Sequence, residues 1–270
     1  MEFEIKQYDG PYEVAGLEIS NEGEMLNGLI YFPPKSFRKP YPVIIYFHGF
    51  PQLYSLSEII KSYKYLLDLG FAFIVFNFRG YRFSEGNVSI NSQVSDSLKI
   101  LEFIDLMGKD NIFNINKINI IGHDFGAYIA LILCSKIRKI HKLILIAPIL
   151  DLQKHIYQDD FKKLLYYINR FLTDSIKGIS NIAEFINLTK KELSQKEHQI
   201  RNFVQHLKIN KLKIVVGTVD KITPISEVEE VMQNSNIEYE LILIEVMDHD
   251  IINEEALLKI NKEIKKFFEY

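Results

Sequence analysis

The chain alternates short apolar runs with longer amphipathic stretches over most of its length. The apolar runs cover residues 42–49, 71–78, 117–124, 142–150, 211–220 and 239–246. Continuous Ile, Val and Phe runs of this length are typical of strands buried on both faces of a parallel sheet. Helical periodicity occupies residues 55–69, 91–108, 125–138, 225–235 and 253–269. The alternation therefore predicts an α/β fold, in which helices cover both faces of a mostly parallel sheet.

Two segments depart from this alternation. Residues 12–20 and 24–32 flank the turn-like Asn21-Glu22-Gly23, which predicts a hairpin that adds antiparallel strands to one edge of the sheet. Residues 151–210 separate two strand runs by far more than an ordinary crossover. We therefore predict a core made of residues 1–150 and 211–270, with a helical lid inserted at 151–210.

Composition narrows the possible partners. The chain has 270 residues, of which 47% are hydrophobic and 25% charged, with a net charge of −3. These values are typical of a folded protein and give no electrostatic drive toward nucleic acid. No apolar run approaches the ~20 residues of a membrane span, and MEFEIKQYDG at the start does not resemble a signal peptide. We expect a cytoplasmic protein with a small-molecule substrate and no nucleic-acid or membrane partner; its oligomeric state stays open.

The sequence predicts neither a metal nor a cofactor. Cys134 is the single cysteine, so the chain has no internal disulfide and no multi-cysteine zinc site. The seven histidines lack metal-ligand spacing, and no glycine-rich phosphate loop is present.

The most informative motif is Gly122-His123-Asp124-Phe125-Gly126, which lies between a strand run and a helical stretch. In this context the pattern is that of a nucleophile elbow, a sharp turn that presents one side chain above the end of a strand. Asp is among the residues that best tolerate the positive φ of such a turn. The motif therefore predicts Asp124 as a nucleophile.

Two later residues complete a possible triad. Asp220 ends one strand run, and His249 follows the last run. The order nucleophile, acid, histidine is the chain order of α/β-hydrolase triads. We therefore predict that Asp220 orients His249 and that His249 acts as a base.

These residues, together with His48-Gly49-Phe50-Pro51, Arg79-Gly80-Tyr81 and Ser84-Glu85-Gly86, resemble the α/β-hydrolase superfamily over nearly the whole chain. The resemblance implies the α/β-hydrolase fold and an oxyanion hole made by the backbone N–H groups of Phe50 and Phe125. An elbow Asp resembles the epoxide hydrolase and haloalkane dehalogenase branch. The stretches RGYRFSEGN and LIAPILDL and the compact lid instead resemble esterases and prolyl-oligopeptidase-type hydrolases.

Among the possible substrates of an Asp nucleophile, the sequence favours an epoxide. A carboxylate is ionised at neutral pH and can attack a saturated carbon to form an alkyl-enzyme ester. Dehalogenases of this branch usually hold the halide with tryptophans, and the chain has none. Epoxide hydrolases use lid tyrosines as acids, so Tyr157, Tyr166 and Tyr167 are candidate substrate-binding residues, although amphipathic packing explains them equally well.

The sequence thus favours an epoxide hydrolase-like enzyme. Two alternatives stay open: an esterase- or peptidase-like hydrolase whose elbow serine has become Asp124 and which is weak or inactive, and a non-catalytic protein that binds ligands on the same fold.

Overall fold

The computed structural model describes residues 7–137, 140–173, 175–251 and 253–269. Residues 1–6, which carry part of the signal-peptide argument, lie outside the described residues. Within the described residues, the strands form one nine-stranded sheet in the order β1-β2-β3-β5-β4-β6-β7-β8-β9. The strands are β1 (Gln7–Asp9), β2 (Tyr12–Asn21), β3 (Glu24–Tyr31), β4 (Tyr41–Phe47), β5 (Ala72–Asn77), β6 (Phe113–His123), β7 (Ile140–Ile146), β8 (Ile209–Gly217) and β9 (Tyr239–Ile244).

The predicted hairpin and parallel sheet are both present. β2 pairs antiparallel with β3, and β3 pairs antiparallel with β5. From β5 onward every pairing is parallel. The short β1, which the sequence pattern missed, extends the antiparallel edge. The predicted fold class is therefore confirmed.

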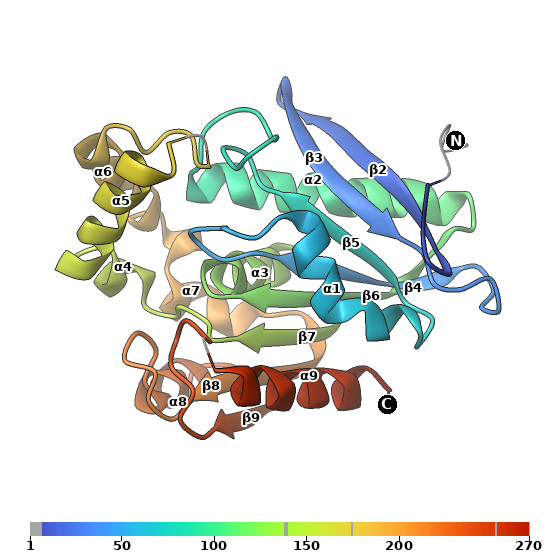
Figure 1. The fold of residues 1–270 in the computed structure, drawn as a ribbon. Coiled ribbons are helices and arrows are strands. Elements are labelled where there is room, and N and C mark those ends of the chain that lie inside the picture. Colours follow the sequence, from blue (N-terminus) through green and yellow to red (C-terminus); the bar gives the residue numbers. More distant parts are fainter. Residues whose placement is uncertain (1–6, 138–139, 174, 252, 270) are drawn as a thin grey trace.

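Helices cover both faces of the sheet (Figure 1). On one face, α1 (Leu56–Leu67) and α9 (Glu254–Glu269) pack through Ile60, Leu66, Ile260 and Ile264. On the other face lie α2 (Ile90–Lys109), α3 (Phe125–Lys136) and α8 (Ile225–Met232). Helix α3 is buried along almost all of its length, because its sequence FGAYIALILC is apolar on every side.

One strand differs from the predicted double-sided burial. β9 forms the outer edge of the sheet and pairs with β8. Its residues are mostly half-buried or exposed, and Leu243 is 46% exposed. An apolar run is thus compatible with an edge strand, and the sequence pattern does not distinguish the two positions.

Short helices occupy the chain between β7 and β8, beyond one end of the sheet (Figure 1). They are α4 (Leu152–His155), α5 (Asp159–Phe171), α6 (Ile182–Leu193), η1 (Lys196–His198), α7 (Ile200–Phe203) and η2 (Val204–His206). On α5 the apolar residues Phe161, Leu165 and Ile168 are buried and form an inward-facing stripe.

Candidate active site

The candidate site residues lie on loops that leave one edge of the sheet. Asp124 follows β6, Asp220 follows β8, and His249 follows β9. Phe50 lies in the loop after β4. Because these four strands belong to the parallel part of the sheet, their carboxyl ends meet at one edge. The topology therefore brings together residues that are far apart in the sequence.

Asp124 has the backbone geometry of an elbow. It lies between the end of β6 and the start of α3, with φ 51° and ψ −120°. Its N–H donates to the Ile146 carbonyl over 3.0 Å, and its own carbonyl accepts from the N–H of Ala127 over 3.1 Å. A Cβ at Gly126 would lie 2.3 Å from the Phe47 carbonyl oxygen. Only glycine permits this approach of α3 to β4, which fixes where the elbow presents Asp124.

The three predicted triad residues form one hydrogen-bonded chain. His249 Nε2 lies 3.1 Å from Asp124 Oδ1, and His249 Nδ1 lies 3.0 Å from Asp220 Oδ2. The other oxygen of Asp220 accepts from the backbone N–H groups of Ile222 and Thr223 over 2.8 and 2.9 Å. Asp220 is therefore rigidly held, and it fixes the orientation of the imidazole.

The charges in this chain differ from those of a serine triad. Burial alone would lower the pKa of His249, but hydrogen bonds to Asp124 and Asp220 outweigh it and raise that pKa to about 10. Burial would raise the pKa of the Asp124 carboxyl, yet His249 holds it below its ordinary value. Both ring nitrogens of His249 therefore carry protons at neutral pH, and each donates to a carboxylate.

The second oxygen of Asp124 faces a backbone donor. The Phe50 N–H donates to Asp124 Oδ2 over 2.6 Å. His48 holds this loop, because its Nδ1–H donates to the Gly49 carbonyl over 2.9 Å and its Nε2 accepts from the Phe78 N–H over 3.2 Å. Burial lowers the pKa of His48 to about 4, so the ring is neutral. Phe125, the other predicted oxyanion residue, begins α3 directly after the elbow.

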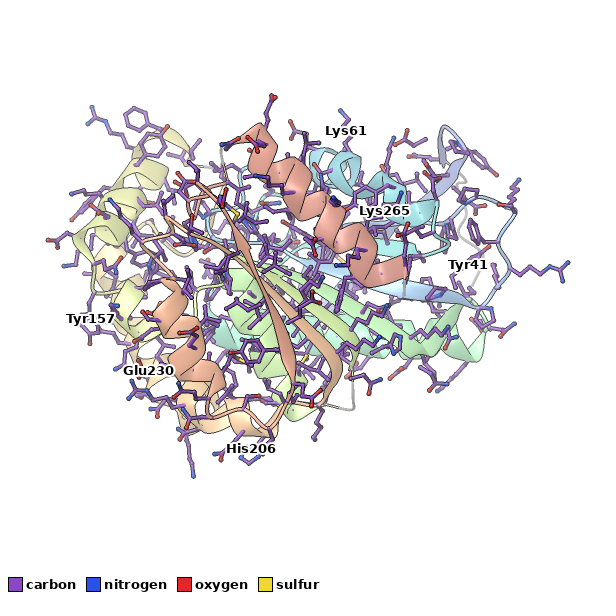
Figure 2. All side chains as sticks on the ribbon, turned by 90° about the horizontal axis from the view of Figure 1, so that it is seen from below. Tyr41, Lys61, Tyr157, His206, Glu230 and Lys265 are labelled. Atoms are coloured by element: carbon purple, nitrogen blue, oxygen red, sulfur yellow. The ribbon has the colours of Figure 1, made fainter. Side chains whose placement is uncertain are left out.

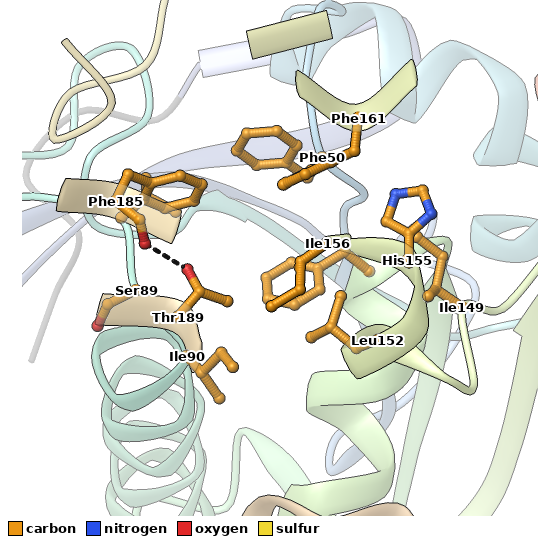
Figure 3. Close-up of a pocket in the computed structure, with 12 residues that line it drawn as sticks. Phe50, Ser89, Ile90, Ile149, Leu152, His155, Ile156, Phe161, Phe185 and Thr189 are labelled. Carbon is orange, nitrogen blue, oxygen red and sulfur yellow. Dashed lines mark hydrogen bonds between the residues drawn. The ribbon is translucent and has the colours of Figure 1, made fainter. Parts of the chain in front are cut away.

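A pocket lies between the site and the short helices. It holds about 410 Å³ of empty space, part of it open to solvent. Figure 3 shows Phe50, Phe161 and Phe185 around it, with Ile156 and Leu152 on the opposite side. Phe50 stacks on Phe185 at a ring-centroid distance of 6.0 Å. The lining is mostly apolar, and its polar side chains are those of Ser89, His155 and Thr189.

Comparison with known proteins settles the family. Residues 42–177, half of the chain, match the family described as "alpha/beta hydrolase fold". The chain belongs to this family. The triad and elbow described above are thus features of an α/β hydrolase.

The proteins similar to this chain include a lipase that matches in sequence and solved structures that match in fold. The lysophosphatidylserine lipase ABHD12 of Danio rerio is 29% identical over 142 residues, covering 51% of this chain and 36% of the fish protein. The match thus spans about a third of that relative's length. Est1E of Butyrivibrio proteoclasticus with bound ferulic acid has a TM-score of 0.70 at 17% identity, covering 93% and 97% of the two chains. XC6422 of Xanthomonas campestris, described as a serine hydrolase without lid, has a TM-score of 0.64 at 16% identity, covering 94% and 92%.

The lid tyrosines of this α/β hydrolase do not take the predicted positions. Tyr157, Tyr166 and Tyr167 are 54%, 66% and 53% exposed, and none of them lines the pocket. Tyr157 lies at the edge of the molecule (Figure 2), with Lys190 Nζ 4.3 Å from its ring centroid. The apolar stripe of α5 turns inward and leaves Tyr166 and Tyr167 on the outer side. The structure therefore does not bring these tyrosines into the pocket, and their role in substrate binding stays a prediction.

Sequence reasoning also missed one polar residue of the pocket. His155 lines the pocket at the end of α4, and no motif surrounds it in the sequence. The available signal in the sequence was the presence of isolated histidines within residues 151–210.

Among the described residues, no group of three or more His, Cys, Asp or Glu side chains could hold a metal ion. In the described part of the chain, no helix is long and apolar enough to cross a membrane.

Proposed function

We propose that this protein is a hydrolase in which the Asp124 carboxylate attacks a saturated, activated carbon, with a small neutral epoxide as substrate. One observation carries the proposal: Asp124 Oδ1 is held by His249, while Oδ2 is held by the Phe50 N–H. The two oxygens thus have different environments. Oδ1 is the attacking atom, and Oδ2 occupies the position of an oxyanion.

The protonated His249 of the resting enzyme supplies the proton for the first step. Attack by Oδ1 forms a C–O bond to Asp124, breaks the epoxide C–O bond and leaves an alkoxide. The His249 imidazolium gives its Nε2 proton to this alkoxide and becomes neutral. In this scheme His249 takes the place of the lid tyrosines as the acid. The ester no longer carries the Asp124 charge, so His249 loses one of the two carboxylates that favoured its protonation.

The neutral His249 then serves as a base. It takes a proton from water, which attacks Cγ of the ester, and the negative charge develops on Oδ2. The Phe50 N–H already points at this atom over 2.6 Å, and we assign the Phe125 N–H as the second donor. Collapse of the intermediate releases the diol, with the water oxygen retained on Asp124 and the His249 imidazolium restored.

The pocket supports a neutral, apolar substrate. Its lining contains four phenylalanines and no Lys, Arg, Asp or Glu among the described residues. A phosphate group buried there would lack a cationic partner, at a large desolvation cost. We therefore infer a substrate class without the charged headgroup of lysophosphatidylserine.

Oxygen labelling in a single turnover tests this proposal. Excess enzyme in H₂¹⁸O is mixed with an aryl epoxide such as styrene oxide, and both the diol and the Asp124 peptide are weighed by mass spectrometry. We expect ¹⁸O in the peptide and none in the diol, with no turnover by Asp124→Asn. Label in the diol alone, or absence of turnover of styrene oxide by folded enzyme, would overturn the proposal.

A trapping experiment isolates the nucleophile. Bromide leaves without a proton, so His249→Gln should react with benzyl bromide and keep a benzyl group on Asp124. Asp124→Asn is the matched control and should stay unmodified at this position. Absence of the adduct in folded His249→Gln would contradict the assignment of Asp124.

A second candidate rests on the similarity to serine hydrolases. In this alternative, Asp124 replaces an ancestral serine and the pocket has lost turnover. Asp124→Ser would then gain activity on p-nitrophenyl acetate, while wild-type protein would be inert toward both epoxides and esters. Turnover of an epoxide by the wild-type protein would exclude this alternative.

A further inference from the structure

The polar side chains of the pocket differ in whether their hydrogen bonds are already used. Thr189 Oγ1 donates to the Phe185 carbonyl over 2.8 Å. Ser89 Oγ accepts from the Ser92 N–H over 3.0 Å at the start of α2. His155 Nδ1, in contrast, is buried and has no hydrogen-bond partner among the described residues. A buried polar atom without a partner is unfavourable, which points to a partner that arrives with the ligand.

The position of His155 is fixed by its helix. Asp151 caps α4 by accepting from the Lys154 N–H over 2.8 Å. The Asp151 N–H itself donates to Glu227 Oε1 over 3.1 Å, which ties α4 to α8. The imidazole packs against the Phe161 ring at a centroid distance of 5.1 Å. Figure 3 shows this ring at the edge of the pocket, near Phe161 and Ile149. Among the described residues, no hydrogen bond to Nδ1 contributes to the placement of this ring.

The charge state of His155 suits a donor rather than an acid. Burial holds its pKa below the ordinary value of 6.5, and the charges of Asp124 and His249 act on it in opposite directions. His155 lines the same pocket as Phe50, whose N–H donates to Asp124, and Phe125, which directly follows Asp124 in the chain. At neutral pH it is uncharged, and one ring nitrogen carries a proton. A neutral imidazole can donate a hydrogen bond to a developing negative charge without giving up its proton.

We propose that His155 is a catalytic residue whose Nδ1–H donates a hydrogen bond to the substrate oxygen that leaves the attacked carbon. This inference rests on the proposed function of Asp124. During ring opening the epoxide C–O bond breaks and its electron pair stays on oxygen. His155 stabilises that oxygen and remains neutral, while the proton comes from His249. The residue therefore selects substrates that carry an oxygen next to the reactive carbon.

The substrate class follows from this arrangement. Apart from His155, the pocket offers the ligand apolar and aromatic surface. A site that provides one buried donor discriminates against ligands that cannot use it. An aryl or alkyl epoxide, with one oxygen and an apolar substituent, matches both features. An alkyl bromide of the same shape lacks the oxygen acceptor.

Comparison of two leaving groups tests the role of His155. The variants are His155→Phe, which keeps an aromatic ring, and His155→Gln, which keeps a donor, with His206→Phe, at an exposed histidine outside the pocket, as control. We measure kcat/KM for styrene oxide and the rate of bromide release from benzyl bromide. We expect His155→Phe to lower kcat/KM for the epoxide about 10²-fold, with bromide release unchanged and partial recovery of epoxide turnover in His155→Gln.

The outcomes separate this inference from the proposed function. An equal loss with both substrates, or no loss with either, would overturn the role of His155 and leave Asp124 as the nucleophile. If wild-type enzyme releases no bromide and opens no epoxide, both proposals fail. Circular dichroism confirms that each variant is folded, and His155→Leu replaces His155→Phe if the latter is not.

Discussion

The charge of His249 can be tested by removing one carboxylate. Asp124→Asn keeps the shape of the side chain and tolerates the positive φ of the elbow, but it deletes the charge 3.1 Å from His249 Nε2. The pKa of His249 is about 10, against an ordinary value of 6.5. Burial opposes the two carboxylates, and together they outweigh it, so the loss of one carboxylate should remove at least half of this rise. We expect Asp124→Asn to lower the pKa by about two pH units, or about 3 kcal/mol.

Nuclear magnetic resonance can follow this titration directly. Histidine labelled with ¹⁵N reports the protonation of each ring nitrogen, and His249→Gln identifies the His249 signals. Two results would refute the idea that the two carboxylates raise the pKa of His249: a wild-type His249 that titrates near 6.5, or a pKa that does not change in Asp124→Asn. Either result would also refute His249 as the proposed source of the proton in epoxide opening.

Stability should follow the same charge. The folded protein binds the His249 proton more tightly than the unfolded chain, whose pKa is near the ordinary 6.5. This stabilisation is therefore complete below about pH 6.5 and is lost as the pH rises toward about 10. Urea unfolding at about pH 6 and about pH 9 should show a larger decrease in wild-type protein than in Asp124→Asn. Equal decreases in the two proteins would contradict the assignment.

Three further predictions concern the surroundings of the site. In Gly49→Ala the new Cβ would lie 2.4 Å from Asp124 Oδ2, so epoxide turnover should fall about 10²-fold. The control is Gly16→Ala, whose Cβ would have nothing within 4 Å and which should match wild type in the same assay. Replacing both Tyr166 and Tyr167 by serine should leave kcat and KM unchanged, whereas a loss of turnover would support their predicted role in substrate binding. Asp96→Asn removes the buried partner that accepts from Arg79 Nε over 2.7 Å; urea unfolding should show a loss of about 3 kcal/mol, against less than about 1 kcal/mol for Glu102→Gln at an exposed pair.

The fold and the proximity of Asp124, Asp220 and His249 could be predicted from sequence because each depends on a local pattern. Parallel strands buried on two faces leave continuous apolar runs, and the elbow needs glycines at fixed positions around Asp124. The order of Asp124, Asp220 and His249 then placed the three side chains at one sheet edge. Distances of 3.0 and 3.1 Å between them agree with that placement.

The pocket could not be predicted in the same way. Its lining comes from the loop after β4, the start of α2 and the short helices between β7 and β8. Which side of α5 faces inward is decided by packing against these segments. Tyr166 and Tyr167 lie on the outer side, whereas His155, which carries no motif, lines the pocket. The spacing of apolar residues along the sequence does not indicate how far a side chain lies from the site in three dimensions.

The elbow residue determines more than the identity of the nucleophile. With serine at this position, the imidazole would lie between a neutral hydroxyl and a single carboxylate. With Asp124 it lies between two carboxylates, and the buried site is closer to charge balance when His249 is protonated. The free enzyme therefore stores a proton where a serine hydrolase holds a base. In the proposed reaction, formation of an ester at Asp124 would remove one of these charges and release that proton, so that a base for the second step would be generated only after the first step.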